Sequence, residues 1–180
     1  FEARPALDAV LKEVQQEFTE AEYDMQQLTA KFRTFCKEGH GDDAALGCLI
    51  KSAAELTTRD APRWEMIAAR FWLLRFRKRV AIYEAEVGIC NLHDKINHLT
   101  KEGVYGSYIL QNYSRAEINE FEKLLDAERD KLFNYSGLEL LHGRYLIRTR
   151  GGRVPETPQE MFLGIAMHLA MNEKEGRAAW

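Results

Sequence analysis

Residues 157–170, Thr-Pro-Gln-Glu-Met-Phe-Leu-Gly-Ile-Ala-Met-His-Leu-Ala, carry the strongest helix-start pattern in the chain. Thr157 can accept a backbone hydrogen bond at a helix start, Pro158 suits the first helical position, and Glu160 completes a capping box. The residues behind the box are largely apolar and recur at helical spacing. This stretch therefore predicts a capped α-helix with an apolar face.

The same pattern recurs toward the N-terminus, where helix starts are frequent and strand patterns are scarce. Gly39-His40-Gly41 predicts a break between two helices. The predicted helices begin at Pro5, behind a Thr19–Glu22 box, at Asp42 or Asp43, at Asp60-Ala61-Pro62 (to about Tyr83), near Ile89 (to Lys101), behind a Ser114–Glu117 box, and at Ser136-Gly137 (to Gly143). One β-hairpin is expected, from Arg144–Arg148 through Gly151-Gly152 to Val154. The predicted fold is mainly α with one small β-hairpin.

Composition limits the class of protein. The chain has 180 residues, of which 46% are apolar and 29% are charged, an ordinary globular mixture. Its net charge of −3 argues against a general nucleic-acid binder. The longest apolar run, 44–50, is far shorter than the roughly 20 residues of a membrane span. These properties predict no nucleic-acid partner and no membrane association.

The cysteines and the two chain ends support two further expectations. Three cysteines without a Cys-x-x-Cys pair are typical of a reducing, cytoplasmic protein. The chain begins with Phe1 instead of methionine, and residues 173–177 look like the start of another helix. We therefore expect a fragment, cut at both ends.

Two short patterns resemble parts of metal sites. Cys90-x-x-His93, with His98 nearby, resembles half of a zinc site, but no second pair has matching spacing. Glu139-x-x-His142 copies one half of a di-iron motif, which needs two such pairs and two further glutamates. The sequence therefore predicts no metal site. It also contains no Walker loop, dinucleotide fingerprint or nucleophile elbow.

The densest basic segment lies near the end of the helix that begins at residue 60. It contains Arg70, Arg75, Arg77, Lys78 and Arg79. Cations there can complement the negative end of the helix dipole, and they can also form a patch for nucleotide phosphates. Spacing alone favours the first interpretation.

Two ordered sets of residues resemble the N-terminal region of the class I ribonucleotide reductase large subunit. The first runs from Ile50-Lys-Ser-Ala-Ala-Glu-Leu-Thr-Thr-Arg-Asp-Ala-Pro62 to Ile67-Ala-Ala-Arg70 and Leu74-Arg-Phe-Arg-Lys78. The second comprises Arg129-Asp-Lys-Leu-Phe-Asn-Tyr-Ser-Gly-Leu138, Gly143-Arg-Tyr-Leu-Ile147 and Glu156-Thr-Pro-Gln-Glu-Met-Phe162. Together they cover nearly the whole chain, and their order is more specific than any single piece.

The resemblance implies a division of labour within a larger enzyme. The family reduces ribonucleoside diphosphates to deoxyribonucleotides for DNA synthesis by radical chemistry in a ten-stranded α/β barrel that follows this region. Residues 1–86 then resemble a truncated or degenerate ATP cone, and residues 87–180 the all-α N-terminal domain. The implied partners are the rest of the large subunit, a second copy of it, and a small radical-generating subunit that holds a metal–radical cofactor. No cysteine here matches a family catalytic motif, so this segment alone is expected to be inactive.

The resemblance also identifies a candidate nucleotide site for the effectors ATP and dATP. Lys78 matches the family's nucleotide-contacting lysine, while Asp42 falls where the family has a hydroxyl residue. The cone's N-terminal hairpin is missing before Phe1. Because an acid close to a triphosphate is unfavourable, we expect a silent cone. A nucleotide-binding or subunit-docking regulatory module is the alternative function.

Overall fold

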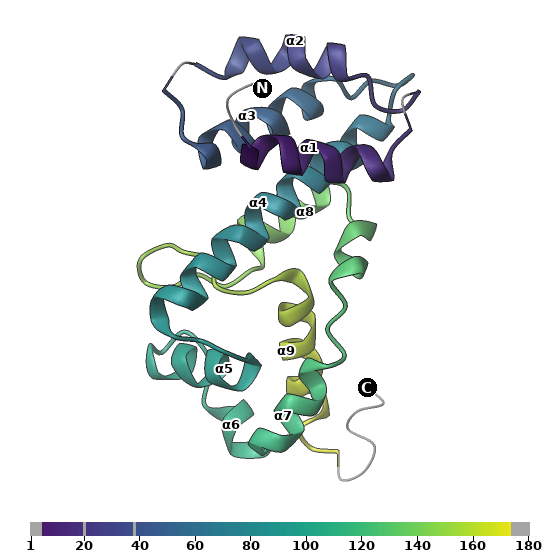
Figure 1. Cartoon of the computed structure of the whole chain (residues 1–180). Coiled ribbons are helices and arrows are strands. Elements are labelled where there is room, and N and C mark those ends of the chain that lie inside the picture. Colours follow the sequence, from purple (N-terminus) through teal and green to yellow (C-terminus); the bar gives the residue numbers. More distant parts are fainter. Residues whose placement is uncertain (1–4, 20, 38, 174–180) are drawn as a thin grey trace. The chain divides into compact units, whose positions relative to one another are not determined.

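The computed structural model describes residues 5–19, 21–37 and 39–173, and these residues are mostly helical (Figure 1). The elements are α1 (Pro5–Glu17), α2 (Met25–Phe35), α3 (Asp42–Glu55), α4 (Arg63–Val87), α5 (Leu92–Lys101), α6 (Tyr108–Asn112), α7 (Arg115–Glu122), η1 (Ala127–Leu132), α8 (Tyr135–Arg144) and α9 (Pro158–Ala170). No strand occurs within the described ranges. The mainly α fold is confirmed. None of the described helices has the length and apolar character that a membrane crossing requires.

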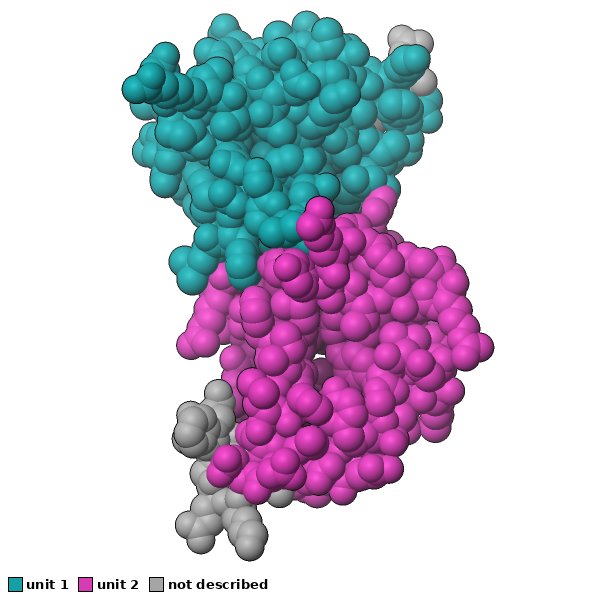
Figure 2. Space-filling view, turned by 180° about the vertical axis from the view of Figure 1, so that it is seen from behind, with its two compact units in different colours: residues 1–78, 131–140 teal, residues 79–130, 141–180 magenta. Residues whose placement is uncertain are grey.

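The chain forms two compact units, which are interleaved in sequence (Figure 2). Unit 1 contains residues 1–78 and 131–140, and unit 2 contains residues 79–130 and 141–180. The chain therefore passes from one unit to the other three times, within α4, within η1 and within α8. The division of the chain at residues 86 and 87, which the family resemblance implies, stays a prediction.

Unit 1 is built around α3, which packs against both α1 and α2 (Figure 1). The helix predicted to begin at Pro5 is confirmed as α1, and its Leu7, Leu11 and Val14 are buried and lie three or four residues apart, the spacing of one helix face. The same core contains Leu28 of α2, Leu46, Leu49, Ile50 and Ala53 of α3, and Trp64, Ile67, Ala68 and Phe71 of α4.

Unit 2 has its own core, in which α5 packs against α6 and α7, and α6 against α9. Its buried cluster consists of Leu92, Ile96, Ile109, Tyr113, Ile118, Phe121 and Met167. The Tyr113 hydroxyl donates a 2.7 Å hydrogen bond to the Met167 carbonyl and so joins the end of α6 to α9. This core fixes the position of α9 within unit 2.

The start of α2 differs from the prediction. The Thr19–Glu22 pair does form, with Glu22 Oε2 accepting hydrogen bonds from the Thr19 amide and hydroxyl, but it closes a turn before the helix. The N-cap is Asp24, whose side chain accepts hydrogen bonds from the amides of Gln26 and Gln27. An acid one residue before Met25 satisfies the first amides more directly than Thr19, which lies five residues further back.

Other helix boundaries moved by a few residues. The N-cap of α3 is Gly41, so Asp42 and Asp43 lie in the first turn, where acids complement the helix dipole. α4 extends to Val87, one turn beyond the predicted end, and α5 begins only at Leu92 behind Asn91. Local patterns located the helices but not their last turns, because helix ends depend on packing.

At α8 the expected Ser136-Gly137 cap is wrong. Asn134 accepts a 2.8 Å hydrogen bond from the Gly137 amide, and Ser136 lies inside the helix, where its hydroxyl donates to Glu65 of α4 at 2.6 Å. The boxes at Ser114 and Thr157 are confirmed, and each shows both reciprocal hydrogen bonds. α6 and η1 were not predicted. The helix expected from residues 173–177 lies almost entirely outside the described residues.

The expected β-hairpin between α8 and α9 is also wrong. A turn does form, because Gly152 adopts φ +78° and the Thr149 amide donates to the Arg153 carbonyl at 2.9 Å. Backbone pairing between the two sides of the loop does not continue beyond this turn in the described residues. The Ile147 amide donates instead to the carboxylate of Glu156 at 2.8 Å. A buried side chain thus takes the place of a second strand.

Candidate functional site

The two residues of the candidate nucleotide site both lie on the surface of unit 1. Lys78 is exposed on α4, and Asp42 is exposed as the first residue of α3. No ion pair joins Lys78 to Asp42 in the part of the chain that the structure describes. Their exposure leaves both side chains screened by solvent and salt.

The neighbouring basic residues are engaged by acids of the same unit. Arg75 donates two hydrogen bonds to Asp43, at 3.0 and 2.8 Å, which join α4 to the first turn of α3. Arg70, which is 8% exposed, pairs with Glu17 of α1 at 2.6 Å. These contacts give Arg70 and Arg75 a role in connecting helices, and they leave less positive charge for a phosphate.

The Glu139-x-x-His142 pattern is divided by the fold. Glu139 belongs to unit 1, where its carboxylate accepts a 2.5 Å hydrogen bond from the indole of Trp72, whereas His142 belongs to unit 2. The indole stacks on Phe76, with 4.7 Å between the ring centres. Glu139 therefore anchors α8 to α4 within unit 1.

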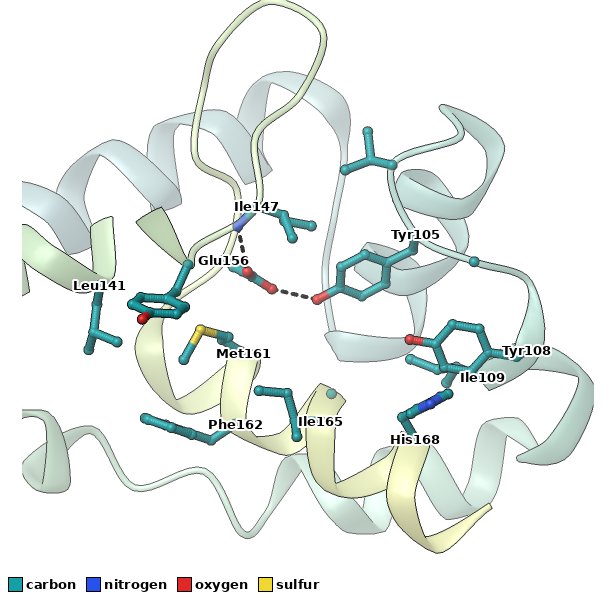
Figure 3. A pocket seen from close by; sticks show the side chains of 14 residues that line it. Tyr105, Tyr108, Ile109, Leu141, Ile147, Glu156, Met161, Phe162, Ile165 and His168 are labelled. Carbon is teal, nitrogen blue, oxygen red and sulfur yellow. Dashed lines mark hydrogen bonds between the residues drawn. The ribbon is translucent and has the colours of Figure 1, made fainter. Parts of the chain in front are cut away.

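A cavity of about 660 Å³ in unit 2 lies between α6, the end of α8 and α9 (Figure 3). Its wall is mainly apolar, with Leu141, Ile147, Met161, Phe162 and Ile165 among its lining residues. Polar groups come from Tyr105, Tyr108, Glu156 and His168, and the rings of Tyr108 and His168 meet edge to face, 4.8 Å apart. An apolar wall with a few polar groups is typical of a binding pocket.

Glu156 is the most deeply buried acid of this cavity, with 1% of its surface exposed. It accepts hydrogen bonds from the Tyr105 hydroxyl at 2.5 Å and from the Ile147 amide at 2.8 Å (Figure 3). Burial raises the pKa of Glu156, and the two hydrogen bonds oppose that shift. Burial and the adjacent carboxyl also raise the pKa of Tyr105. Glu156 is thus held by two donors at the cavity wall.

A second buried charge lies close by. Lys95 of α5 is 2% exposed and pairs with Glu84 of α4 and Glu160 of α9, each at 2.5 Å. Glu160 also accepts the Thr157 amide at 2.7 Å and so closes the capping box. A buried charge is stable only when it is paired, and here the two partners of Lys95 come from two other helices. The network therefore connects α4, α5 and α9 within unit 2.

Sequence reasoning assigned no role to Glu156 or Lys95: Glu156 was only the first residue of a family-like stretch, and Lys95 belongs to no motif. One hint was present: Glu156 directly precedes the Thr157 box, at the point where the chain enters a buried helix. The arrangement contains paired charges and hydrogen-bonded polar groups around an apolar cavity. It is suited to binding and to holding helices together.

Comparisons with known proteins agree with the helical fold. Residues 131–180 match the family described as "Ribonucleotide reductase, all-alpha domain". Over 171 residues, 95% of this chain and 20% of the relative, the chain is 48% identical to the ribonucleoside-diphosphate reductase subunit alpha of Treponema pallidum. The chain belongs to the ribonucleotide reductase large-subunit family.

More distant relatives carry the same name. The chain is 30% identical to the ribonucleoside-diphosphate reductase 1 subunit alpha of Escherichia coli, over 69% of this chain and 16% of that protein. It is 31% identical to the ribonucleoside-diphosphate reductase subunit alpha of Enterobacteria phage T4, over 86% of this chain and 20% of that protein. The chain spans at most about a fifth of the length of these relatives.

Proposed function

We propose that this chain is the N-terminal helical part of the large subunit of a cytoplasmic ribonucleoside-diphosphate reductase. The whole protein converts ribonucleoside diphosphates to deoxyribonucleoside diphosphates. The observation that carries the proposal is the 48% identity over 95% of the chain to a subunit of that name. A small subunit with a metal–radical cofactor is the proposed partner, and the large subunit is proposed to form a homodimer.

Within that enzyme the segment has a structural or regulatory role, and the catalytic cysteines lie outside it. Several contacts support this role. The buried Lys95 of unit 2 is paired with Glu84 and Glu160, and Arg70 and Arg75 hold helices of unit 1 together. The cavity of unit 2 brings Glu156 together with tyrosines and one histidine, and no cysteine lines it.

The rest of the large subunit is the proposed partner of an exposed apolar stripe of α9, part of which borders the cavity of unit 2. Phe162, Ile165 and Leu169 are spaced by three and four residues, and they are 45%, 49% and 73% exposed. Apolar side chains at this spacing form one stripe, which favours contact with another apolar surface. Relatives about five times longer than this chain have the polypeptide to cover it.

The test uses the full-length protein that carries this segment, mixed with its small subunit, a dithiol reductant and a ribonucleoside diphosphate. We expect deoxyribonucleoside diphosphate to form, and we expect the Cys90→Ser variant to keep the wild-type kcat, because Cys90 takes no part in the chemistry. Absence of product with an intact radical in the small subunit would contradict the proposed activity. Loss of turnover in Cys90→Ser would contradict only the non-catalytic role of this cysteine.

For the nucleotide site we propose that Lys78 and Asp42 give weak binding of ATP or dATP or none. Lys78 is an exposed side chain in the C-terminal half of α4, and Asp42 and Asp43 put two acids in the first turn of α3, where negative charge repels a phosphate. Calorimetry with dATP tests this, with Lys101→Ala, which removes another exposed helical lysine, as the control. A low-micromolar dissociation constant that Lys78→Ala abolishes and Lys101→Ala preserves would show a working regulatory site.

A further inference from the structure

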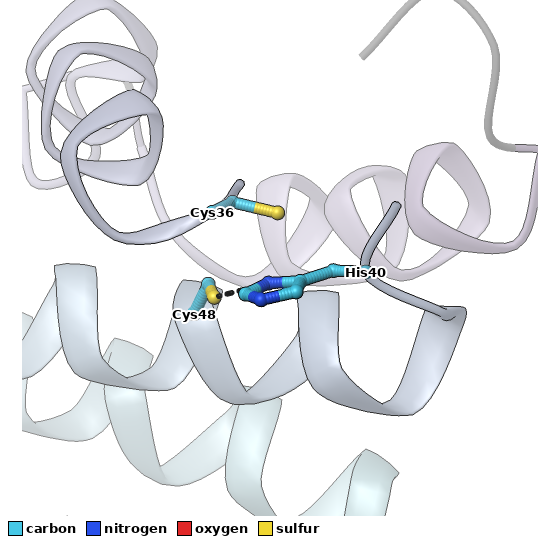
Figure 4. A group of neighbouring side chains, drawn as sticks. All are labelled: Cys36, His40 and Cys48. Carbon is cyan, nitrogen blue, oxygen red and sulfur yellow. Dashed lines mark hydrogen bonds between the residues drawn. The ribbon is translucent and has the colours of Figure 1, made fainter. Parts of the chain in front are cut away.

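Two cysteines and one histidine of unit 1 lie together where α2 is connected to α3 (Figure 4). Cys36 is the C-cap of α2, His40 lies in the connecting loop, and Cys48 is on α3. One ligand atom from each lies within 4.8 Å of the other two, and Cys48 Sγ is 3.6 Å from His40 Nδ1. Among the described residues this is the one group of three or more potential metal ligands.

The distance between the Cys48 sulfur and the His40 nitrogen fits a tetrahedral metal ion. A zinc ion binds thiolate sulfur at about 2.3 Å and imidazole nitrogen at about 2.1 Å. At a tetrahedral angle, those bond lengths place the sulfur and nitrogen roughly 3.6 Å apart. The observed Cys48–His40 separation already has this value. Cys36 Sγ lies within 4.8 Å of both atoms and is therefore the candidate third ligand.

The donor types select the metal. Two thiolates and one imidazole are soft or borderline ligands that favour zinc over magnesium or calcium, which prefer oxygen. When Zn²⁺ binds, each thiol loses its proton to solvent, so two negative sulfurs balance the two positive charges. A neutral centre suits this location, since Cys48 is 9% exposed and its two partners are half-buried.

The loop is built to bring His40 back toward the helices. Gly39 adopts φ +87°, a conformation that glycine reaches easily, and Gly41 is the N-cap of α3. The chain thus reverses between Cys36 and Cys48 and leaves the imidazole facing the Cys48 sulfur (Figure 4).

We propose that Cys36, His40 and Cys48 bind one zinc ion, with water as the fourth ligand, and that this ion fixes the connection between α2 and α3. The proposal departs from the sequence expectation of no metal site. It is independent of the reductase assignment. In the sequence, Cys90-x-x-His93 was considered as half of a zinc site and rejected, and Cys36, His40 and Cys48 were not connected with one another.

The experiment uses the full-length protein purified in the presence of a thiol-free reductant. Metal content after loading with Zn²⁺ and desalting is compared between wild type, Cys36→Ser, His40→Gln and Cys48→Ser. We expect each variant to retain one fewer equivalent of zinc than wild type. The affinity for zinc should fall by more than about 100-fold, because loss of a residue that only supports a ligand lowers metal affinity by up to about that factor. With Co²⁺, only wild type should show thiolate charge-transfer absorption and the intense visible bands of a tetrahedral ion from this site.

The matched control is Cys90→Ser/His93→Gln, which removes the same ligand types elsewhere and should retain the full metal content. Because Cys48 is buried and its variant could unfold, Cys36→Ser and His40→Gln, at half-buried positions, decide the result once circular dichroism shows wild-type helix content. Equal zinc content in wild type and in these two variants would overturn the proposal. The proposal would also be overturned if the reduced protein took up no zinc at these three residues and Cys36 and Cys48 instead formed a disulfide in air.

Discussion

Glu156 shows how one buried carboxyl changes the local fold. Its oxygens accept hydrogen bonds from the Ile147 amide and the Tyr105 hydroxyl. The loop from residue 147 to residue 156 is therefore closed by a side-chain hydrogen bond instead of by pairing between two strands. The residue is 1% exposed, and burial is the main cause of its raised pKa. The contact places the chain entering α9 against the loop after α8, both in unit 2.

This arrangement predicts a pH effect on stability. The folded protein holds the Glu156 proton to a higher pH than the unfolded chain, because the pKa of Glu156 is raised in the folded state. The contribution of this residue to the free energy of unfolding therefore falls as the pH rises from the unfolded value, about 4.5, through the raised folded value. Glu156→Gln removes this dependence, so its stability relative to wild type should increase with pH.

Urea unfolding at several pH values measures that difference, with Glu156→Ala as the contrasting variant. Alanine leaves the Ile147 amide and the Tyr105 hydroxyl without their acceptor, which should cost about 2–3 kcal/mol. Glutamine can accept from the amide and donate to the tyrosine oxygen, so it should cost less. Equal pH profiles for wild type and Glu156→Gln would contradict the raised pKa.

At the scale of elements, helix starts depend on single side chains that satisfy the first amides. Among the described residues, five helix starts use a side-chain oxygen for this purpose: Asp24, Asn91, Ser114, Asn134 and Thr157. Two of these, at Ser114 and Thr157, are complete capping boxes. In both units, these helices thus begin at residues whose side chains accept hydrogen bonds from amides of the first turn.

The Thr157 box should contribute measurably to stability. Thr157 accepts from the Glu160 amide at 3.3 Å, and Thr157→Ala removes that acceptor. We expect a loss of about 1 kcal/mol in the free energy of unfolding. Thr157→Ser keeps the hydroxyl and serves as the control. A denaturation midpoint unchanged in Thr157→Ala would contradict the capped start of α9.

A second pair of variants distinguishes the two candidate caps of α2. Asp24→Ala should cost about 1 kcal/mol, because two amides of the first turn lose their acceptor. Thr19→Ala should have a smaller effect, since its bonds with Glu22 close an exposed turn. Chemical denaturation of both variants provides the test, and a larger loss in Thr19→Ala would support a cap at Thr19.

At the scale of the whole molecule, the apolar face of α9 predicts self-association of the 180-residue chain. Ile165 and Leu169 are about half and three quarters exposed, on a helix that also lines the cavity of unit 2. Sedimentation velocity should show association that grows with concentration, because separate chains can cover these faces with one another.

The double variant Ile165→Gln/Leu169→Gln should associate less. Ile82→Gln serves as the control, because Ile82 is an isolated side chain on α4 with comparable exposure, 45%. A wild-type chain that stays monomeric at high concentration would contradict the idea of an uncovered face. Equal association of the double variant and wild type would place the contact elsewhere.

The sequence by itself determined the helical fold, most helix positions and the family. The apolar spacing of α1 and the boxes at Ser114 and Thr157 are interactions between residues three or four apart, so they can be recognised without the fold. The ordered motifs pointed to the ribonucleotide reductase large subunit, which the similarity to relatives supports independently of the structure.

Only the tertiary structure decided which distant residues meet. The two interleaved units, the Lys95 network, the Glu156 contact in place of a hairpin, and the grouping of Cys36, His40 and Cys48 all join separate elements or loops. Such contacts depend on how helices pack, and the pattern around each residue does not encode its distant partner. The physical reason is that local hydrogen bonds fix a helix, whereas burial of apolar faces fixes its neighbours.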